Sequence, residues 1–299
     1  IILTASASGD YFGCSASDAG DLNGDGFGDF IIGAEYADVP ASSIGKAYIY
    51  YGGNIISPIP SLTLTGFAGS DFFGTSVACA GDVNGDGYSD VIVGASYNDA
   101  GGTNSGAAFI FYGGVTMNNV SDLTLAGESA NDAFGFCVAS AGDINGDGFS
   151  DVIVSAPYND AGAMDAGRAY VYLGGSSMNN TADLIYTGAA AVDVFGNSVS
   201  GAGDVNADGY EDIIIGAPFN SSGGINAGRA YLYFGGALPD NTVDVIFTGS
   251  AANDYLGYSV ACAGDVNCDG FSDMIIGVPN SDIGGTNWGC ANMYYGGTS

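Results

Sequence analysis

A nine-residue acidic motif, Asp-x-Asn-x-Asp-Gly-x-x-Asp, occurs five times in the chain, and successive copies are 61 residues apart. Carboxylate and amide oxygens at alternate positions of a tight loop suit a hard cation such as Ca²⁺, which takes roughly six to eight oxygen ligands. The glycine at the sixth position gives the backbone the freedom to curl around an ion. The motif therefore predicts five calcium sites, one in each copy.

The expected ligands of each site are the side chains at positions 1, 3, 5 and 9 of the motif and the backbone carbonyl oxygen at position 7. The five expected sets are Asp21, Asn23, Asp25, Phe27 and Asp29; Asp82, Asn84, Asp86, Tyr88 and Asp90; Asp143, Asn145, Asp147, Phe149 and Asp151; Asp204, Asn206, Asp208, Tyr210 and Asp212; and Asp265, Asn267, Asp269, Phe271 and Asp273. A metal-free interpretation stays open, because Asp and Asn also favour turns by accepting backbone hydrogen bonds.

The same opening residues begin an EF-hand loop, but an EF-hand requires a bidentate Glu at position 12. That position is apolar in every copy and lies in an expected strand; the residues are Ile32, Val93, Val154, Ile215 and Ile276. The EF-hand interpretation is therefore rejected.

The composition limits the class of protein and of partner. Of 299 residues, 47% are apolar and 52 are glycine, which together with the strict repeat indicates a packed, turn-rich all-β protein. Three basic residues against 33 acidic ones give a formal charge of −30, which excludes a nucleic-acid partner because phosphate binding needs Lys and Arg. No apolar run approaches the roughly 18 residues of a membrane span, so no membrane insertion is expected.

The elements that must position the loops are visible in the second copy. Expected strands cover residues 75–80, 91–94, 107–112 and 123–126, with turn residues between them, and the acidic loop joins the first two. Four short antiparallel strands per unit describe one blade of a β-propeller. We therefore predict a single five-bladed β-propeller domain over residues 1–299, with blades at about 8–65, 69–126, 130–187, 191–248 and 252–297 plus 1–5.

The two ends of the sequence suggest how such a ring closes. Ile1–Thr4 aligns with Leu62–Thr65, which is an expected fourth strand, whereas the last copy reaches only its third strand at residues 292–295. We expect Ile1–Thr4 to join the last blade and give a closed, monomeric ring without a free edge. A fragment of a larger propeller and an open solenoid are the alternatives. Cys14 and Cys290 are expected near this seam, where a disulfide would lock the ring.

A second set of motifs accompanies the acidic loop. In the fourth copy it comprises Phe195-Gly196, the segment from Ala202 to Asp212, Ile214–Pro218 and Gly228–Tyr233. This combination resembles the FG-GAP repeat of integrin α-subunit propellers and their bacterial relatives, and the resemblance covers essentially the whole chain. It implies a β-propeller with calcium between the first two strands of a blade, and a role in adhesion or ligand recognition. Integrin propellers have seven blades and only some of theirs carry calcium, whereas this chain has five intact loops.

The loops between the second and third strands of each blade are the expected ligand face. They carry an aromatic residue and an acid in the first three copies, at Tyr36/Asp38, Tyr97/Asp99 and Tyr158/Asp160. The resemblance implies that this face binds a protein, and aromatic rings beside carboxylates also suit a glycan. The alternative is that these residues pack only within their own loops.

Three functional classes remain, and we expect the first. It is a non-catalytic, calcium-binding adhesion or recognition module that is secreted or displayed on the cell surface, alone or within a larger protein. Extracellular loops of this type bind calcium with Kd near about 10⁻⁴–10⁻³ M, which a cytosol would leave empty. The alternatives are a carbohydrate-active propeller enzyme, for which Glu35 is the one acid expected to face the channel, and a structural spacer. The absence of histidine excludes Ser-His-Asp and Cys-His catalysis.

Overall fold

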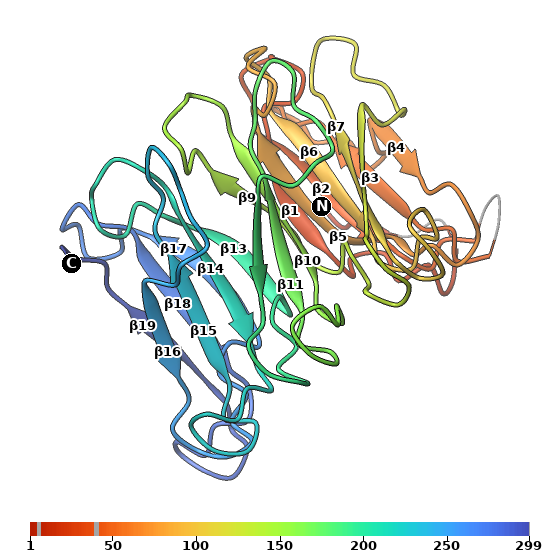
Figure 1. Cartoon of the computed structure of the whole chain (residues 1–299). Coiled ribbons are helices and arrows are strands. Elements are labelled where there is room, and N and C mark those ends of the chain that lie inside the picture. Colours follow the sequence, from red (N-terminus) through yellow and green to blue (C-terminus); the bar gives the residue numbers. More distant parts are fainter. Residues whose placement is uncertain (5–6, 39–41, 299) are drawn as a thin grey trace. The chain divides into compact units, whose positions relative to one another are not determined.

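The structure is a computed structural model that describes residues 1–4, 7–38 and 42–298. Within these ranges the chain forms strands β1 to β19 and no helix, so none of the described residues forms a helix that could cross a membrane (Figure 1). The chain divides into two compact units. The first comprises Ile1–Ser140 and Tyr172–Thr181, and the second comprises Ala141–Val171 and Ala182–Ser299.

Each acidic copy builds one antiparallel sheet in which the strands follow in chain order. The first two sheets are β1 (Ala16–Gly20), β2 (Asp29–Ala34), β3 (Lys46–Tyr50) and β4 (Leu62–Thr65), and β5 (Phe73–Gly81), β6 (Asp90–Ala95), β7 (Ala107–Phe111) and β8 (Leu123–Ala126). The third consists of β9 (Val138–Gly142), β10 (Asp151–Ala156), β11 (Arg168–Tyr172) and β12 (Leu184–Thr187). The predicted strands of the second copy are thereby confirmed.

The last two sheets belong to the second unit. The fourth consists of β13 (Ser198–Gly203), β14 (Asp212–Ala217), β15 (Arg229–Tyr233) and β16 (Val245–Thr248). The fifth has three strands in the described residues: β17 (Val260–Gly264), β18 (Asp273–Val278) and β19 (Cys290–Tyr294). The all-β prediction and the five antiparallel sheets are confirmed, and four of these sheets have the predicted four strands.

The second strands of the second, third and fourth sheets are buried along their whole length. All six residues are buried in β6, β10 and β14, which is why these strands read as continuous apolar runs rather than alternating patterns. Neighbouring sheets meet through their first strands, because β1 contacts β5 in the first unit and β13 contacts β17 in the second.

The Phe-Gly pair lies where two consecutive sheets approach each other. Phe73 is fully buried, and its backbone pairs in parallel with Gly45 of the preceding repeat. Gly74 has a φ of 90°, and a Cβ there would lie 2.4 Å from the carbonyl oxygen of Lys46. Only glycine fits this close approach in a left-handed conformation, so the motif is explained by packing between repeats.

Ile1–Thr4, Cys14 and Cys290 are the residues expected at the seam of the ring. Ile1–Thr4 forms no strand in the described residues, and the exposed fractions of Ile1 and Ile2 are 81% and 85%; Ala5 lies outside the described residues. Ring closure through this segment therefore stays a prediction. The six cysteines form no disulfide in the structure. Because Cys14 belongs to the first unit and Cys290 to the second, the predicted disulfide between them stays a prediction.

Candidate metal loops and ligand-binding face

The first acidic loop is organised around the carboxylate of Asp21. Its Oδ1 accepts the backbone N–H groups of Gly24 (2.8 Å) and Asp25 (3.1 Å), and its Oδ2 accepts that of Gly26 (2.9 Å). Asn23 Oδ1 accepts the N–H of Asp25 at 2.8 Å, and Asp25 Oδ1 accepts that of Phe27 at 3.0 Å. These bonds curl the backbone around its own acidic side chains.

The other four loops repeat this geometry. In each of them the first-position carboxylate accepts the N–H groups of positions 5 and 6, and the fifth-position carboxylate accepts that of position 7. The sixth-position glycines have φ between 86° and 92°. The left-handed backbone that glycine was expected to provide is therefore present in every loop.

The ninth-position aspartate has a structural role that the sequence did not reveal. Asp90 is fully buried; its Oδ2 accepts the N–H of Val83 (2.9 Å) and its Oδ1 accepts that of Gly113 (2.8 Å), just after β7. Asp212 makes the same pair of bonds with Val205 and Gly235. Burial raises the pKa of both carboxyl groups to about 7. This aspartate ties the acidic loop to the end of the third strand.

The chemistry of the loops fits a calcium ion, but the side chains do not form a closed cage. In each loop, four side chains within nine residues offer an oxygen atom as a metal ligand. The expected sets contain no His or Cys, so no imidazole nitrogen or thiolate sulfur would ligate the metal. Among the described residues, no three acidic, histidine or cysteine side chains converge as a metal centre. The intraloop hydrogen bonds are those expected of an Asx turn with or without a metal, so the 25 predicted ligands stay a prediction.

Consecutive acidic loops are joined to each other within each unit. The N–H of Ser89 donates to the carbonyl oxygen of Asp21 in the first unit, at 3.1 Å. In the second unit, the N–H groups of Glu211 and Ser272 donate to the carbonyl oxygens of Asp143 and Asp204, at 3.3 and 2.9 Å. The ring of Tyr88 also lies over Gly24, where an added Cβ would be only 2.5 Å from it. Each of these loops is thus held in place partly by hydrogen bonds and contacts with the next loop in the same unit.

The opposite end of the sheets carries a row of aromatic rings in the first unit. Tyr11 contacts Tyr36, Tyr36 contacts Phe72 and Phe72 contacts Tyr97, with centroid distances of 4.7, 5.0 and 5.0 Å. Tyr11, Tyr36 and Tyr97 have exposed fractions of 65%, 39% and 45%. We call Tyr11, Tyr36, Phe72 and Tyr97 the aromatic row. Sequence analysis identified Tyr36 and Tyr97 but missed Tyr11 and Phe72, although both directly precede the Phe-Gly position.

The acids of these loops are partly engaged by their own backbone. Asp38 Oδ1 accepts the N–H of Ser43 and Asp99 Oδ1 accepts that of Asn104, both at 2.8 Å. Both carboxylates lie in exposed loops, and each has a second oxygen. The structure thus brings aromatic rings and carboxylates to the same end of the sheets, as predicted, while one oxygen of each acid holds its loop.

A pocket of about 370 Å³ lies beside the aromatic row. It is lined by Phe67, Phe109, Asp71, Asn98 and Asp99, and the ring of Phe67 is 62% exposed. Asp71 Oδ2 accepts the side-chain N–H of Asn98 at 2.7 Å. Burial raises the pKa of Asp71. An exposed ring beside amide and carboxylate groups gives the pocket both stacking and hydrogen-bonding capacity.

The acid considered for catalysis is engaged in a structural bond. Glu35 Oε2 accepts the hydroxyl hydrogen of Thr75 at 2.7 Å. Hydrolysis of a glycoside would require a second carboxyl group within about 5–10 Å on the opposite side of the substrate, and sequence analysis identified no partner for Glu35.

Comparison with known proteins agrees with the repeat geometry. The FG-GAP repeat family matches residues 15–50, 73–111, 138–172 and 195–233. Integrin alpha-5 of Xenopus laevis is 33% identical over 220 residues, which are 69% of this chain and 20% of that protein. Integrin alpha-V of Gallus gallus is 34% identical over 216 residues, again 69% of this chain and 20% of the relative.

A longer alignment reaches the fifth copy of the repeat. Integrin alpha-8 of Gallus gallus is 28% identical over 312 residues, covering 92% of this chain and 28% of that protein. The chain thus spans between 20% and 28% of the length of these relatives. The four matched segments begin at or near the first strand of a sheet and end with the third, so they contain the acidic loop and the buried second strand. The chain is a member of the FG-GAP repeat family and is related to the integrin α-subunits.

Proposed function

We propose that the chain is a calcium-loaded, five-bladed β-propeller that recognises a protein or glycan ligand outside the cell and catalyses no reaction. The observation that carries this proposal is the aromatic row, which exposes a run of tilted and edge-to-face rings at the end of the sheets opposite the acidic loops. Exposed aromatic side chains held by a rigid scaffold are typical of recognition surfaces.

Calcium would be held by the five ligand sets given above. When bound, a cation supplies positive charge that offsets the repulsion between the crowded carboxylates of each loop. The hydrogen bonds from Ser89 to Asp21 and from Ser272 to Asp204 join consecutive loops, so that a loop ordered by calcium would also stabilise the conformation of its neighbour. In this account calcium stabilises the scaffold, and the ligand binds at the opposite end.

We also propose that the ring is closed and that the protein lies outside the cell or on its surface. Ile1–Thr4 would supply a fourth strand beside β19 and close a monomeric ring. An extracellular or cell-surface location is supported by the relation to integrin α-subunits and by the weak calcium affinity expected of such loops.

The test uses the whole chain in millimolar calcium. Binding is measured to an array of neutral and acidic oligosaccharides and to a panel of immobilised extracellular-matrix proteins. A chain with Tyr36→Ala and Tyr97→Ala is compared with Tyr295→Ala, which removes an exposed tyrosine outside the aromatic row. We expect the double variant to bind at least about tenfold more weakly and the control to bind normally. Failure of the unmodified chain to bind any probe, or equal binding by the double variant, would contradict the proposal.

A further inference from the structure

The pocket of about 370 Å³ beside the aromatic row brings two aromatic rings together with a buried carboxylate. The rings belong to Phe67 and Phe109, and their centroids are 4.9 Å apart. Asp71 and Asn98 also line the pocket, and their exposed fractions are only 3% and 8%. All of these residues belong to the first unit.

Only one oxygen of the Asp71 carboxylate is engaged by the protein. Oδ2 accepts the side-chain N–H of Asn98 at 2.7 Å and the backbone N–H of Ala68 at 3.1 Å. Within the described ranges, Oδ1 accepts no hydrogen bond and is not fully enclosed, and no basic side chain pairs with the carboxylate. Because a buried charge without a partner is costly, this oxygen favours a cation in the pocket.

In the fourth copy of the repeat, the chain supplies such a cation itself. Asp193 corresponds to Asp71, and its Oδ2 accepts the side-chain N–H of Asn220 at 2.7 Å. Burial raises the pKa of Asp193, and the positive charge of Arg229 partly offsets this effect. Arg229 also interacts with the hydroxyl group of Tyr231. A guanidinium group therefore lies near the buried carboxylate of this copy.

The second copy lacks both of these partners. Ala107 stands at the position of Arg229, and Phe109 stands at the position of Tyr231. The first and third copies have a basic residue at the position of Ala107; these residues are Lys46 and Arg168. Phe67 is the one aromatic residue at its own repeat position, where the other copies have Ser6, Glu128, Ala189 and Ser250. The second copy thus exchanges a cation and a hydroxyl group for an open pocket with aromatic rings.

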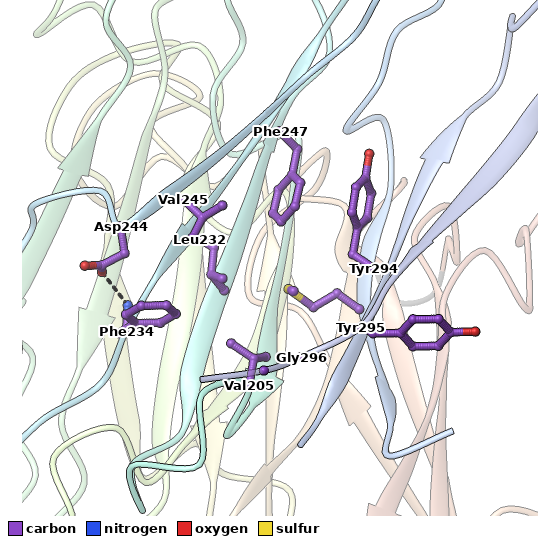
Figure 2. Close-up of a pocket in the computed structure, with 11 residues that line it drawn as sticks. Val205, Leu232, Phe234, Asp244, Val245, Phe247, Tyr294, Tyr295 and Gly296 are labelled. Atoms are coloured by element: carbon purple, nitrogen blue, oxygen red, sulfur yellow. Dashed lines mark hydrogen bonds between the residues drawn. The ribbon is translucent and has the colours of Figure 1, made fainter. Parts of the chain in front are cut away.

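The larger pocket of the second unit, of about 590 Å³, provides a contrast (Figure 2). It also contains two aromatic rings, those of Phe247 and Tyr294, with centroids 4.3 Å apart. Asp244 is the one acid among the described residues that line it, but Asp244 is exposed and its Oδ2 accepts the N–H of Phe234 at 2.7 Å. Figure 2 shows this carboxylate beside Phe234 and apart from the two rings. The buried carboxylate is therefore what distinguishes the pocket beside Asp71.

We propose that the pocket beside Asp71 binds a methylated organic ammonium group, such as the trimethylammonium group of choline. Its charge would pair with the Asp71 carboxylate, and its methyl groups would contact the rings of Phe67 and Phe109. Such a cation has no N–H donor to satisfy, whereas a primary ammonium has three and is strongly hydrated, so a primary ammonium should bind more weakly. The site does not include the aromatic row, and the proposal does not rest on ligand binding there.

The test is isothermal titration calorimetry of the whole chain with choline, in calcium. A parallel titration uses dimethylbutanol, the uncharged isostere in which a carbon atom replaces the nitrogen of choline. Choline should bind saturably and at least about tenfold more tightly than dimethylbutanol, because only choline carries a charge for Asp71. Absence of choline binding, or equal binding of the two compounds, would overturn the proposal.

Choline groups occur in soluble compounds and in lipid headgroups, and sedimentation with phosphatidylcholine vesicles distinguishes these sources. Vesicles of phosphatidylglycerol, which contain no choline, are the control. Sedimentation with the phosphatidylcholine vesicles alone assigns the pocket to a lipid headgroup. Choline binding without such sedimentation assigns it to a soluble compound, and both results support the proposal.

Three protein variants test the residues that carry the proposal. Asp71→Asn removes the charge but keeps an acceptor oxygen for Asn98, so it should weaken choline binding at least about tenfold and leave dimethylbutanol binding unchanged. Phe67→Leu keeps an apolar side chain without the ring and should weaken choline binding about threefold. The chain with Tyr36→Ala and Tyr97→Ala should bind choline normally. Unchanged choline binding by a folded Asp71→Asn protein, or loss of binding in the tyrosine variant, would overturn the proposal.

A further variant returns the internal cation to the second copy. Ala107 pairs with Ala126 between β7 and β8, as Arg229 pairs with Thr248 between β15 and β16. Arg229 Nε also donates to Thr248 Oγ1 at 3.2 Å. The combination of Ala107→Arg and Ala126→Thr should therefore place a guanidinium group near Asp71 and weaken choline binding at least about tenfold. Normal choline binding by this variant, with a thermal melt showing that it is folded, would overturn the proposal.

Discussion

The backbone N–H of Ser89 donates to the carbonyl oxygen of Asp21 across 3.1 Å and so joins the acidic loops of two consecutive repeats. Asp21 is the first residue of one loop, and Ser89 precedes the buried Asp90 of the next. The same bond recurs in the second unit between Ser272 and Asp204. The acidic loops are therefore part of the packing between sheets as well as candidate metal sites.

The two roles of the loop aspartates can be separated by substitution. Asp90→Asn should lower the free energy of unfolding by about 1–3 kcal/mol with or without calcium, because an amide offers one acceptor oxygen to two backbone N–H donors. Asp86→Asn, at an exposed position, should lower stability mainly when calcium is present. Urea unfolding of both variants in EDTA and in calcium measures the difference. An Asp90→Asn protein as stable as the unmodified chain in EDTA would contradict the structural role.

The fourth position of the acidic loop gives two substitutions with opposite expected signs. Gly24 has a φ of 74° and lies under the ring of Tyr88, so Gly24→Ala should destabilise the chain by about 1–2 kcal/mol. Ala207 adopts the same left-handed conformation with a φ of 57°, so Ala207→Gly should be stabilising by up to about 1 kcal/mol. Thermal and urea unfolding test both, and a shift of the same sign in the two variants would contradict the backbone argument.

Sequence periodicity was sufficient to predict the sheets and the position of every acidic loop. The spacing placed Asp82–Asp90 between two strands, and the structure confirms β5 before the loop and β6 from Asp90 onward. This works because the loop chemistry and the buried apolar run recur in register. The number of sheets follows directly from the repeat.

Contacts between residues far apart in the sequence, within a repeat or between repeats, could not be predicted from that periodicity. The pairing of Asp90 with Gly113 joins residues 23 positions apart, and the contact of Tyr36 with Phe72 joins two repeats. Neither is implied by the spacing within one copy. Tyr11, Phe72 and Tyr255 share one repeat position, so an alignment of the copies would have indicated the aromatic row.

Burial of the Phe-Gly phenylalanine should be a major source of stability. Phe73 is fully buried between two sheets, so Phe73→Ala should lower the free energy of unfolding by about 3–5 kcal/mol. Phe67→Ala is the matched control, since Phe67 is 62% exposed and should have an effect below about 1 kcal/mol. Similar effects of the two substitutions in urea unfolding would contradict the packing between repeats.

Asp71 should make stability depend on pH. Burial raises the pKa of its carboxyl group in the folded chain above its ordinary value of 3.8, although Asn98 and Ala68 donate hydrogen bonds to it. The folded chain therefore binds this proton more tightly than the unfolded chain, and the contribution of Asp71 to stability increases as the pH falls toward 3.8.

Asp71→Asn removes this titration and keeps an acceptor oxygen for Asn98. As the pH is lowered from about 7 to 4, the unmodified chain should therefore gain stability relative to the variant. Urea unfolding of both proteins across this range gives the difference. A difference that stays constant, or that falls as the pH is lowered, would contradict the assigned pKa direction.

We propose that the five acidic loops bind calcium and that the bound ions stabilise the scaffold. The most direct measurement is isothermal titration calorimetry of the EDTA-treated and dialysed chain with calcium, paired with thermal melts. We expect five bound ions per chain and a melting temperature that rises with calcium. A titration without binding heat, together with an unchanged melting temperature, would show that the loops are metal-free turns.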